Sequence, residues 1–301
     1  MPLVSIIMNI RNGAATLREA IDSVLAQTLA DWELVVWDDC SRDASAAIVA
    51  QYRDPRIRYF LSPEDVSLGK ARGDAIRQAR GEWIAFLDQD DVWLAGKLEK
   101  QMALAAEGVG LIYGRTIRFY PGGRERDYDH RHEYERLPEG DLFTQLFTKS
   151  CFIAMSSAVF RRSAIEAVGG ISDNIHIIPD YYLYVAVARQ YQVRAVQTTV
   201  CRYRMHAGNM SQVAAVEMHR EVLWLIDHWA GNLDPAIVKQ CRKRHQTAIA
   251  LEEMRSLATL RAGLVRLIVH GSLASQLSRP FAFAFHVMRR KLRRPHWREF
   301  E

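Results

Sequence analysis

The sequence predicts an α/β fold in which a mainly parallel sheet is flanked by helices, with a helical region at the C-terminal end. Over residues 1–105, short apolar segments alternate with amphipathic ones, as in chains that build a parallel sheet with helices on its faces. Polar residues gather directly after successive apolar segments, where the carboxyl ends of parallel strands form a binding crevice. Residues 213–301 contain an amphipathic stretch and a second stretch that opens with Asp234 and Pro235, a favourable helix start.

Four strands are expected because each is a short run rich in β-branched, aromatic and other apolar residues. They cover residues 3–8, 32–37, 56–61 and 83–87. Helices are expected between and after them, at residues 14–26, 41–51, 69–79 and 97–105. In the first of these helices, one face carries Ala20, Ile21, Val24 and Leu25. No Gly-x-Gly-x-x-Gly follows the first strand, which disfavours a dinucleotide-binding fold.

The composition is that of a globular protein that acts in a reducing compartment. The 301 residues are 49% hydrophobic and 25% charged, which is ordinary for a chain with a sizeable core. The four cysteines lie far apart without zinc-binding spacing, which argues against a zinc site or a disulfide framework. The N-terminus lacks a signal-peptide pattern, and no apolar run approaches the roughly 20 residues that span a bilayer. We therefore expect a cytoplasmic protein.

A basic cluster lies close to the end of the sequence. Residues 286–298 hold six of the 40 Lys and Arg side chains and no acidic one, and the apolar residues 281–285 precede them. Two interpretations remain open: a peripheral segment that binds the anionic inner face of the cell membrane, or a helix that packs on the domain. Nucleic acid is disfavoured as a partner, because the aromatic residues do not alternate with basic ones as in single-strand binding surfaces.

The most informative stretch is residues 83–91, where an apolar run ends in three carboxylates. Asp88 and Asp90 are two positions apart, so in an extended chain both would point to the same side. Clustered carboxylates repel one another unless a cation joins them, and Mg²⁺ or Mn²⁺ binds one or two carboxylates together with substrate phosphates. Two interpretations remain open: a cation site, or a solvated acidic loop that caps the following helix.

Similar polar groups follow the first two strands. The first strand leads to Asn9, Arg11 and Asn12, and the second leads to Asp38 and Asp39. Each group alone is ordinary turn chemistry. Because three such groups follow strands of one sheet, we expect them to converge on one crevice.

Together these segments resemble the family 2 glycosyltransferases with the GT-A fold. The resemblance is carried by residues 4–12 (VSIIMNIRN), 20–28 (AIDSVLAQT), 33–43 (ELVVWDDCSRD) and 79–91 (ARGEWIAFLDQDD). In that family the second Asp of the Asp-Asp-x-Ser-x-Asp block, here Asp39, contacts the uracil edge. The resemblance implies nucleotide-sugar contacts from Asn9, Arg11, Asn12, Asp38, Asp39, Arg72, Asp88, Gln89 and Arg204.

The sequence departs from the family pattern at two places in this half. Asn9 stands where the family usually has Pro, and Gly73 stands where Asn is common. The neighbouring Arg72 has two open interpretations, a contact to the diphosphate or a surface arginine on a helix.

A looser resemblance continues over residues 150–212. Residues 178–186 (IPDYYLYVA) resemble the start of the helix that carries the family's general base, here Asp180, although Pro stands at 179 where Glu is usual. Residues 203–211 (YRMHAGNMS) resemble the family's Tyr-Arg-x-His segment, and the resemblance implies that Asp90 and His206 hold Mn²⁺ or Mg²⁺. On the residues alone, Asp180 is equally a helix cap and His206 equally a structural histidine.

The resemblance implies a metal-dependent glycosyltransferase that inverts the anomeric centre. The donor would be a nucleoside-diphosphate sugar, with UDP favoured, and the acceptor a hydroxyl of a glycan or lipid-linked acceptor in surface polysaccharide synthesis. We expect a transferase domain at residues 1–212, divided into a nucleotide-sugar half (1–105) and an acceptor half (106–212), and a helical region at 213–301. A sugar-nucleotide nucleotidyltransferase and a non-catalytic sugar-nucleotide-binding protein are the alternatives.

Overall fold

The computed structural model describes residues 1–269, except residues 121, 128–134, 149–150, 207–208 and 210–213, and only the backbone of residues 254–269. The chain divides into two compact units, Met1–Ile249 and Ala250–Glu301. The predicted boundary at residue 212 stays a prediction. The basic cluster at residues 286–298 lies outside the described residues.

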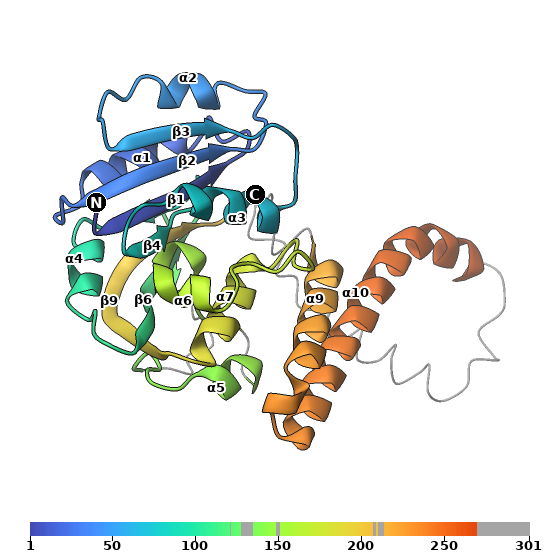
Figure 1. Cartoon of the computed structure of the whole chain (residues 1–301). Helices are drawn as coiled ribbons and strands as arrows, with labels where there is room; N and C mark the ends of the chain where they lie inside the picture. Colours follow the sequence, from blue (N-terminus) through green and yellow to red (C-terminus); the bar gives the residue numbers. More distant parts are fainter. Residues whose placement is uncertain (121, 128–134, 149–150, 207–208, 210–213, 270–301) are drawn as a thin grey trace. The chain divides into compact units, whose positions relative to one another are not determined.

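The described residues form one nine-stranded sheet. The strand order is β3-β2-β1-β4-β8-β6-β9-β5, and β7 pairs with β6 (Figure 1). The strands are β1 Val4–Ile10, β2 Trp32–Asp38, β3 Ile57–Leu61, β4 Trp83–Phe86, β5 Val92–Trp93, β6 Val109–Phe119, β7 Glu125–Asp127, β8 Val159–Arg161 and β9 Gln192–Arg204. Strands β1 to β4 pair in parallel, which confirms the prediction for the first half. The later strands add antiparallel pairs, so the complete sheet is mixed.

Helices flank this sheet, as the alternating pattern predicts. They are α1 Leu17–Leu25, α2 Ser45–Val49, α3 Leu68–Gln78, α4 Lys97–Met102, α5 Phe143–Thr148, α6 Arg162–Ala167, α7 Pro179–Ala188, α9 Ala215–His228 and α10 Pro235–Val269, with 3₁₀ turns η1 Met155–Ser157 and η2 Ala230–Asn232. Helix α2 is shorter than the predicted 41–51. The side chains of Ser41 and Asp43 accept the backbone N–H groups of Asn12 and Ala14, each at 2.9 Å, so these residues build a loop before the helix begins.

Apolar cores cover both faces of the sheet, which explains why its central strands are continuous apolar runs. In β1, Ile6 and Met8 belong to the core that includes α1, whereas Ile7 belongs to the core that includes α3 and α7. All seven residues of β2 are buried. The side chains at the strand ends are therefore held by a rigid layer on each side.

Helices α9 and α10 extend the second of these cores. Val222, Leu225 and Ile226 on α9 are buried in it, and the ring of Trp229 lies 6.2 Å from that of Phe147. Cys241 on α10 is buried in the same core. The C-terminal helices thus contribute to the packing of α7, which carries Asp180.

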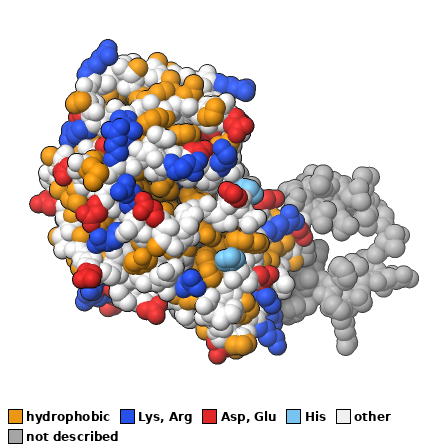
Figure 2. Space-filling model, viewed as in Figure 1, with side chains coloured by type: hydrophobic (Ala, Val, Ile, Leu, Met, Phe, Trp, Pro, Cys, Tyr) orange, Lys and Arg blue, Asp and Glu red, His pale blue; other side chains and the backbone are white. Residues whose placement is uncertain are grey.

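The surface drawn in Figure 2 mixes the two signs of charge. Lys and Arg side chains are interspersed with Asp and Glu side chains on this face, and hydrophobic side chains are visible between them. Within the described part of the chain, no helix combines the length and the apolar character that a bilayer crossing requires.

Candidate active site

The loops that follow β1, β2 and β4 meet at the carboxyl edge of the sheet. The side chain of Gln89 accepts from the Arg11 backbone N at 2.9 Å and donates to the Arg11 carbonyl at 3.1 Å, which joins the β1 loop to the turn after β4. The Asn12 side chain accepts from the Arg42 backbone N at 2.8 Å, which joins the β1 loop to the loop after β2. The structure therefore brings these three groups of residues together.

Two residues of the β1 loop have unusual backbone requirements. Asn12 has a φ of 51°, in the left-handed region that Asn tolerates better than most residues. A Cβ atom on Gly13 would lie 2.2 Å from Oε1 of Gln89. Glycine at this position allows the loop to lie directly against the turn after β4.

The two aspartates after β2 have different surroundings. Asp38 is buried, and its carboxylate accepts the Ser41 backbone N–H at 2.8 Å and the Tyr59 hydroxyl at 2.7 Å, so its visible role is to hold the loop. Asp39 accepts from a guanidinium nitrogen of Arg11 at 3.3 Å. Burial raises the pKa of Asp39, against the opposing effects of a backbone N–H and the Arg11 charge.

A buried ion pair connects α3 to the turn after β4. Arg72 is only 5% exposed, and its guanidinium donates to Oδ1 of Asp88 at 2.6 Å. Burial alone would lower the pKa of Arg72, but the carboxylates of Asp88 and Asp180 raise it. Arg72 is therefore not a surface arginine, and it places a fixed positive charge between two predicted site residues.

Asp180 lies in the first turn of α7, close to this ion pair. Its side chain is partly exposed, and the Arg72 charge and the Tyr181 backbone N–H stabilise its ionised form. Withdrawal from water is the larger effect, and it raises the pKa of Asp180. A carboxylate with a raised pKa is a stronger base than a free aspartate.

The carboxylates after β4 do not lie on an extended strand, so the premise that Asp88 and Asp90 share a side was wrong. The chain turns here, with the Asp91 backbone N donating to the Asp88 carbonyl at 3.1 Å. The turn directs Asp88 to Arg72, whereas Oδ2 of Asp90 lies 2.7 Å from Nε2 of His206. The two side chains therefore have separate partners.

The Asp90–His206 pair has the chemistry of a divalent-cation site. Burial raises the pKa of Asp90, and repulsion from Asp88 raises it further, while His206 opposes the change. A cation beside this carboxylate would favour its ionised form and so oppose that shift in pKa. Carboxylate and imidazole suit Mn²⁺, so the residues fit the expected group. Among the described residues, no set of three or more His, Cys, Asp and Glu side chains is arranged as a metal site.

Asp91 holds together the two segments that carry Asp90 and His206. It is fully buried, and its carboxylate accepts the Ser156 hydroxyl at 2.5 Å and the Arg204 backbone N–H at 2.9 Å. The same Ser156 oxygen accepts the Asp88 backbone N–H at 3.1 Å. Arg204 in turn donates from Nε to the Asp90 carbonyl at 2.7 Å. The end of β9, which leads to His206, is thus tied to the turn that carries Asp90.

Arg204 is largely occupied by these contacts. Its guanidinium also pairs with Glu19 on α1 and lies 4.4 Å above the ring of Phe119. The structure gives Arg204 a scaffolding role, and its predicted contact to phosphate stays a prediction.

Two buried donors at the carboxyl ends of β1 and β2 have no partner in the described residues. They are Nδ2 of Asn9 and Nε1 of Trp37. Asn9 and Trp37 are directly opposite one another in the β1–β2 register, so both side chains lie on the same face of the sheet. Buried donors are normally paired, so these two are suited to an acceptor group that arrives with a ligand.

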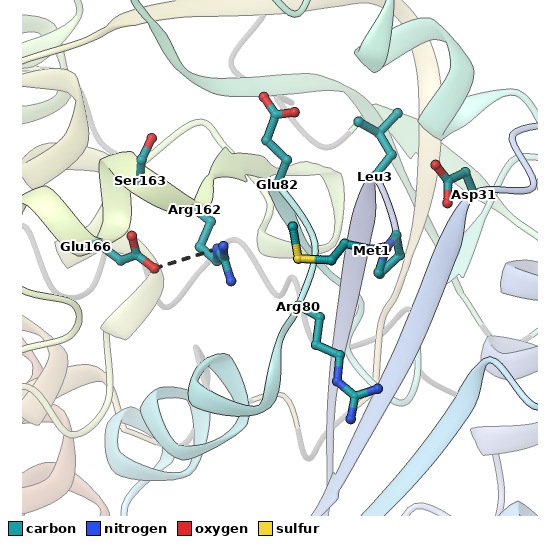
Figure 3. A pocket seen from close by; sticks show the side chains of 9 residues that line it. Met1, Leu3, Asp31, Arg80, Glu82, Arg162, Ser163 and Glu166 are labelled. Atoms are coloured by element: carbon teal, nitrogen blue, oxygen red, sulfur yellow. Dashed lines mark ion pairs between the residues drawn. The ribbon is translucent and has the colours of Figure 1, made fainter.

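A cavity of about 370 Å³ lies elsewhere, and Figure 3 shows its lining. Its residues precede the strands: Leu3 comes before β1, Asp31 before β2 and Glu82 before β4. An ion pair of 3.6 Å between Arg162 and Glu166 borders it (Figure 3). The cavity is therefore at the amino edge of the sheet, opposite the predicted site residues.

Comparison with known sequences shows which family this chain belongs to. The sequence model described as "Glycosyl transferase family 2" matches residues 5–169. The chain belongs to glycosyltransferase family 2. The UDP-Glc:alpha-D-GlcNAc-diphosphoundecaprenol beta-1,3-glucosyltransferase WfgD of Escherichia coli is 30% identical over 221 residues, which are 73% of this chain and 83% of WfgD. This membership favours a transferase over the two alternative functions considered from the sequence.

Solved structures show the same fold as this family 2 transferase. The S. aureus TarS 1–349 structure in complex with UDP-GlcNAc has a TM-score of 0.64 at 19% identity, and the match covers 81% of this chain and 72% of the TarS 1–349 chain. This chain spans 43% of a longer TarS structure. The mannosyltransferase PcManGT from Pyrobaculum calidifontis, in complex with GDP-Man and Mn²⁺, has a TM-score of 0.61 at 20% identity and covers 99% of this chain and 83% of its own. The GT-A fold predicted from the motifs is confirmed.

Several residues that shape the transferase site had no assigned role in the sequence analysis. Asp91 was visible as the third carboxylate of its stretch, but nothing marked it as the buried one. Asn209 is 5% exposed and accepts the His206 backbone N–H at 2.7 Å. Trp37 is an ordinary residue at the end of a predicted strand, and nothing in the sequence marks Ser156, which lies in the 3₁₀ turn η1. Their roles depend on partners far away in the chain.

The hydroxyl of Ser156 supports both Asp91 and the Asp88 backbone, so Ser156→Ala should destabilise the protein by about 2–3 kcal/mol, the effect expected when two buried polar groups lose a hydrogen-bond partner. Ser157→Ala is the matched control. Ser157 is equally buried, but its hydroxyl donates only to the Ala154 carbonyl at 2.8 Å, so its loss should cost about 1 kcal/mol. Urea unfolding of the two variants measures the difference, and equal costs would contradict the role given to Ser156.

Proposed function

We propose that this protein is a divalent-cation-dependent, inverting glycosyltransferase that moves a sugar from a UDP-sugar to a hydroxyl of a lipid-linked glycan. The observation that carries the proposal is the arrangement at the carboxyl edge of the sheet. There the Arg72–Asp88 ion pair acts electrostatically on both the Asp180 carboxylate and Asp90, which pairs with His206. Such an arrangement offers one place for a diphosphate and another for an acceptor hydroxyl.

The nucleotide would lie over the ends of β1 and β2. Asp39 is positioned there by Arg11, and the unpaired donors on Asn9 and Trp37 are available to oxygen atoms of the donor substrate. Solved structures of the same fold are complexes with UDP-GlcNAc, UDP and GDP-Man, which supports a nucleoside-diphosphate sugar as donor, and the UDP-Glc named for WfgD favours UDP. The charge of Arg72 would favour the sugar diphosphate.

Asp90 and His206 would hold the cation, Mn²⁺ or Mg²⁺. A bound divalent cation supplies charge neutralisation for a departing nucleoside diphosphate. The chain offers one carboxylate and one imidazole here, which suits an ion that takes its other ligands from phosphate oxygens and water. The PcManGT complex with GDP-Man and Mn²⁺ supports this assignment.

Asp180 would act as the general base. A carboxylate oxygen of Asp180 accepts the proton of the acceptor hydroxyl as that hydroxyl attacks the anomeric carbon. Because the base is on the side of the acceptor, a single displacement inverts the anomeric centre. The charge of Arg72 stabilises the carboxylate form of this base and offsets part of the effect of burial.

The acceptor is the least constrained part of the proposal. WfgD, the Escherichia coli relative, is named for an acceptor in which GlcNAc is linked to diphosphoundecaprenol. An acceptor of that class lies at a membrane surface. The basic residues 286–298 would then bring the enzyme to the anionic inner face of the cell membrane, in surface polysaccharide synthesis.

Replacement of Asp90 tests the cation site. Asp90→Asn keeps the volume of the side chain and removes its charge, so Mn²⁺-dependent UDP affinity should fall by more than ~10-fold. Titration calorimetry with UDP, with and without Mn²⁺, measures the effect. The control is Asp173→Asn, because Asp173 is exposed and far from this turn in the sequence. If Asp90→Asn bound UDP in Mn²⁺ as tightly as the wild-type protein does, the cation would have to be held elsewhere.

Replacement of Asp180 tests the base. Asp180→Asn should bind UDP normally but lose turnover by at least ~10²-fold. In the wild-type enzyme kcat should fall as the pH drops through the raised pKa of Asp180, because the protonated carboxyl cannot accept a proton. That acid limb should lie above the pH of about 3.9 expected for an ordinary aspartate. Steady-state rates across the pH range measure both effects, and an unchanged limb in Asp180→Asn would assign the base to another group.

A further inference from the structure

Glu221 on α9 accepts the backbone N–H groups of three consecutive residues. Its Oε1 accepts from His176 at 2.9 Å and from Ile177 at 3.1 Å. Its Oε2 accepts from Ile177 and from Ile178, each at 3.0 Å. Hydrogen bonds from backbone N–H groups to an ionised carboxylate are among the stronger ones in proteins. One side chain thus fixes three residues of another segment.

This segment leads directly into α7. Ile178 is the N-cap residue of α7 and has no side-chain acceptor to offer, and Pro179 has no N–H group. Helix starts leave N–H groups without partners inside the helix, and a negative charge near them is favourable. Glu221 therefore supplies from α9 the carboxylate that the local sequence lacks. Asp180 follows two residues after the last of its donors.

The opposite side of the same segment packs closely on α3. The Gly69 backbone N donates to the His176 carbonyl at 3.3 Å. A Cβ atom on Gly69 would lie 2.0 Å from the Ile175 carbonyl oxygen. Helix α3 carries Arg72, whose charge acts on Asp180, so the segment before Asp180 lies between the helix of Arg72 and Glu221.

We infer that Glu221 is a positioning residue for the general base: it holds residues 176–178 so that Asp180 stays beside Arg72 and Asp88. The inference rests on the proposed function of Asp180. A residue on α9 would then help to position the general base, and α9 lies outside residues 5–169, which match the family model. Because Glu221 acts through the backbone before α7, its loss should displace the base without changing the cation pair.

The consequences differ for binding and for turnover. A displacement of about 1 Å in a catalytic group costs up to ~10²-fold in rate. Glu221→Ala should therefore lower kcat by roughly 10- to 100-fold and leave the KM for the donor within about twofold. Glu221→Gln keeps one acceptor oxygen for these N–H groups, so its kcat should lie between those of the wild type and Glu221→Ala.

Two measurements test the inference. Amide hydrogen exchange should become at least ~10-fold faster at residues 176–178 in Glu221→Ala, and by a smaller factor in Glu221→Gln, because these N–H groups lose their acceptor. Turnover is followed as Mn²⁺-dependent UDP release from UDP-glucose and from UDP-GlcNAc. The control is Glu217→Gln, an exposed glutamate on the same helix, which should change neither measurement. If Glu221→Ala fails to fold, the isosteric Glu221→Gln decides.

A double substitution separates positioning from general stability. In the Asp180→Asn background, Glu221→Gln should cause no further loss of turnover, because the group that it positions is already absent. Three results would each overturn the inference. They are unchanged hydrogen exchange at residues 176–178 in the Glu221 variants, an effect on the KM for the donor in place of kcat, and a full additional loss of turnover in the double variant. If Asp180→Asn keeps wild-type turnover, the proposed base fails and the inference fails with it. If the wild-type enzyme releases UDP from neither donor, only the donor assignment fails, and hydrogen exchange alone decides the role of Glu221.

Discussion

The site depends on the buried carboxylate of Asp91. Burial and its neighbours Asp90 and Asp88 raise the pKa of Asp91 well above its usual range. An ionisable group with no access to water is tolerated only when its hydrogen bonds are satisfied, and here the partners are the Ser156 hydroxyl and the Arg204 backbone N–H. These two bonds join the turn after β4, the 3₁₀ turn η1 and the end of β9. Three segments far apart in the chain are therefore fixed at one carboxylate.

The two halves of the transferase contribute different chemistry to the edge that Asp91 holds together. Strands β1 to β4 provide the loops that would take the nucleotide, and they form the parallel half of the sheet. Strand β9 brings His206 to Asp90, and α7 brings Asp180 toward the Arg72–Asp88 pair. Helix α9 supports that second half, since Glu221 holds the backbone before α7. The residues proposed for the nucleotide directly follow strands of the parallel half, whereas His206 and Asp180 come from later segments that contacts between distant residues hold in place.

This difference explains what the sequence could predict. The four parallel strands and the polar groups at their ends follow from local patterns, because burial on both faces makes continuous apolar runs and helix starts require polar residues. The turn at Asp88–Asp91 could not be told from extended chain in the sequence, since no Gly or Pro marks it. Ser156 and Glu221 had no detectable signal: a serine in a short 3₁₀ turn and a glutamate on an amphipathic helix gain their roles only from partners 65 and 43 to 45 residues away. The Pro at position 179 departs from the family pattern. It is compatible with the start of α7, because Glu221 on α9 accepts the backbone N–H of Ile178 just before it.

The central claim is that Asp90 and His206, drawn together by the Asp91 contacts, form the cation site of a UDP-sugar transferase. The most direct test is a crystal structure of the protein grown with Mn²⁺ and UDP, with anomalous scattering recorded at the manganese edge. We expect one anomalous peak in contact with Oδ2 of Asp90, Nε2 of His206 and the diphosphate of UDP. A manganese peak held away from both side chains, with UDP bound, would contradict it.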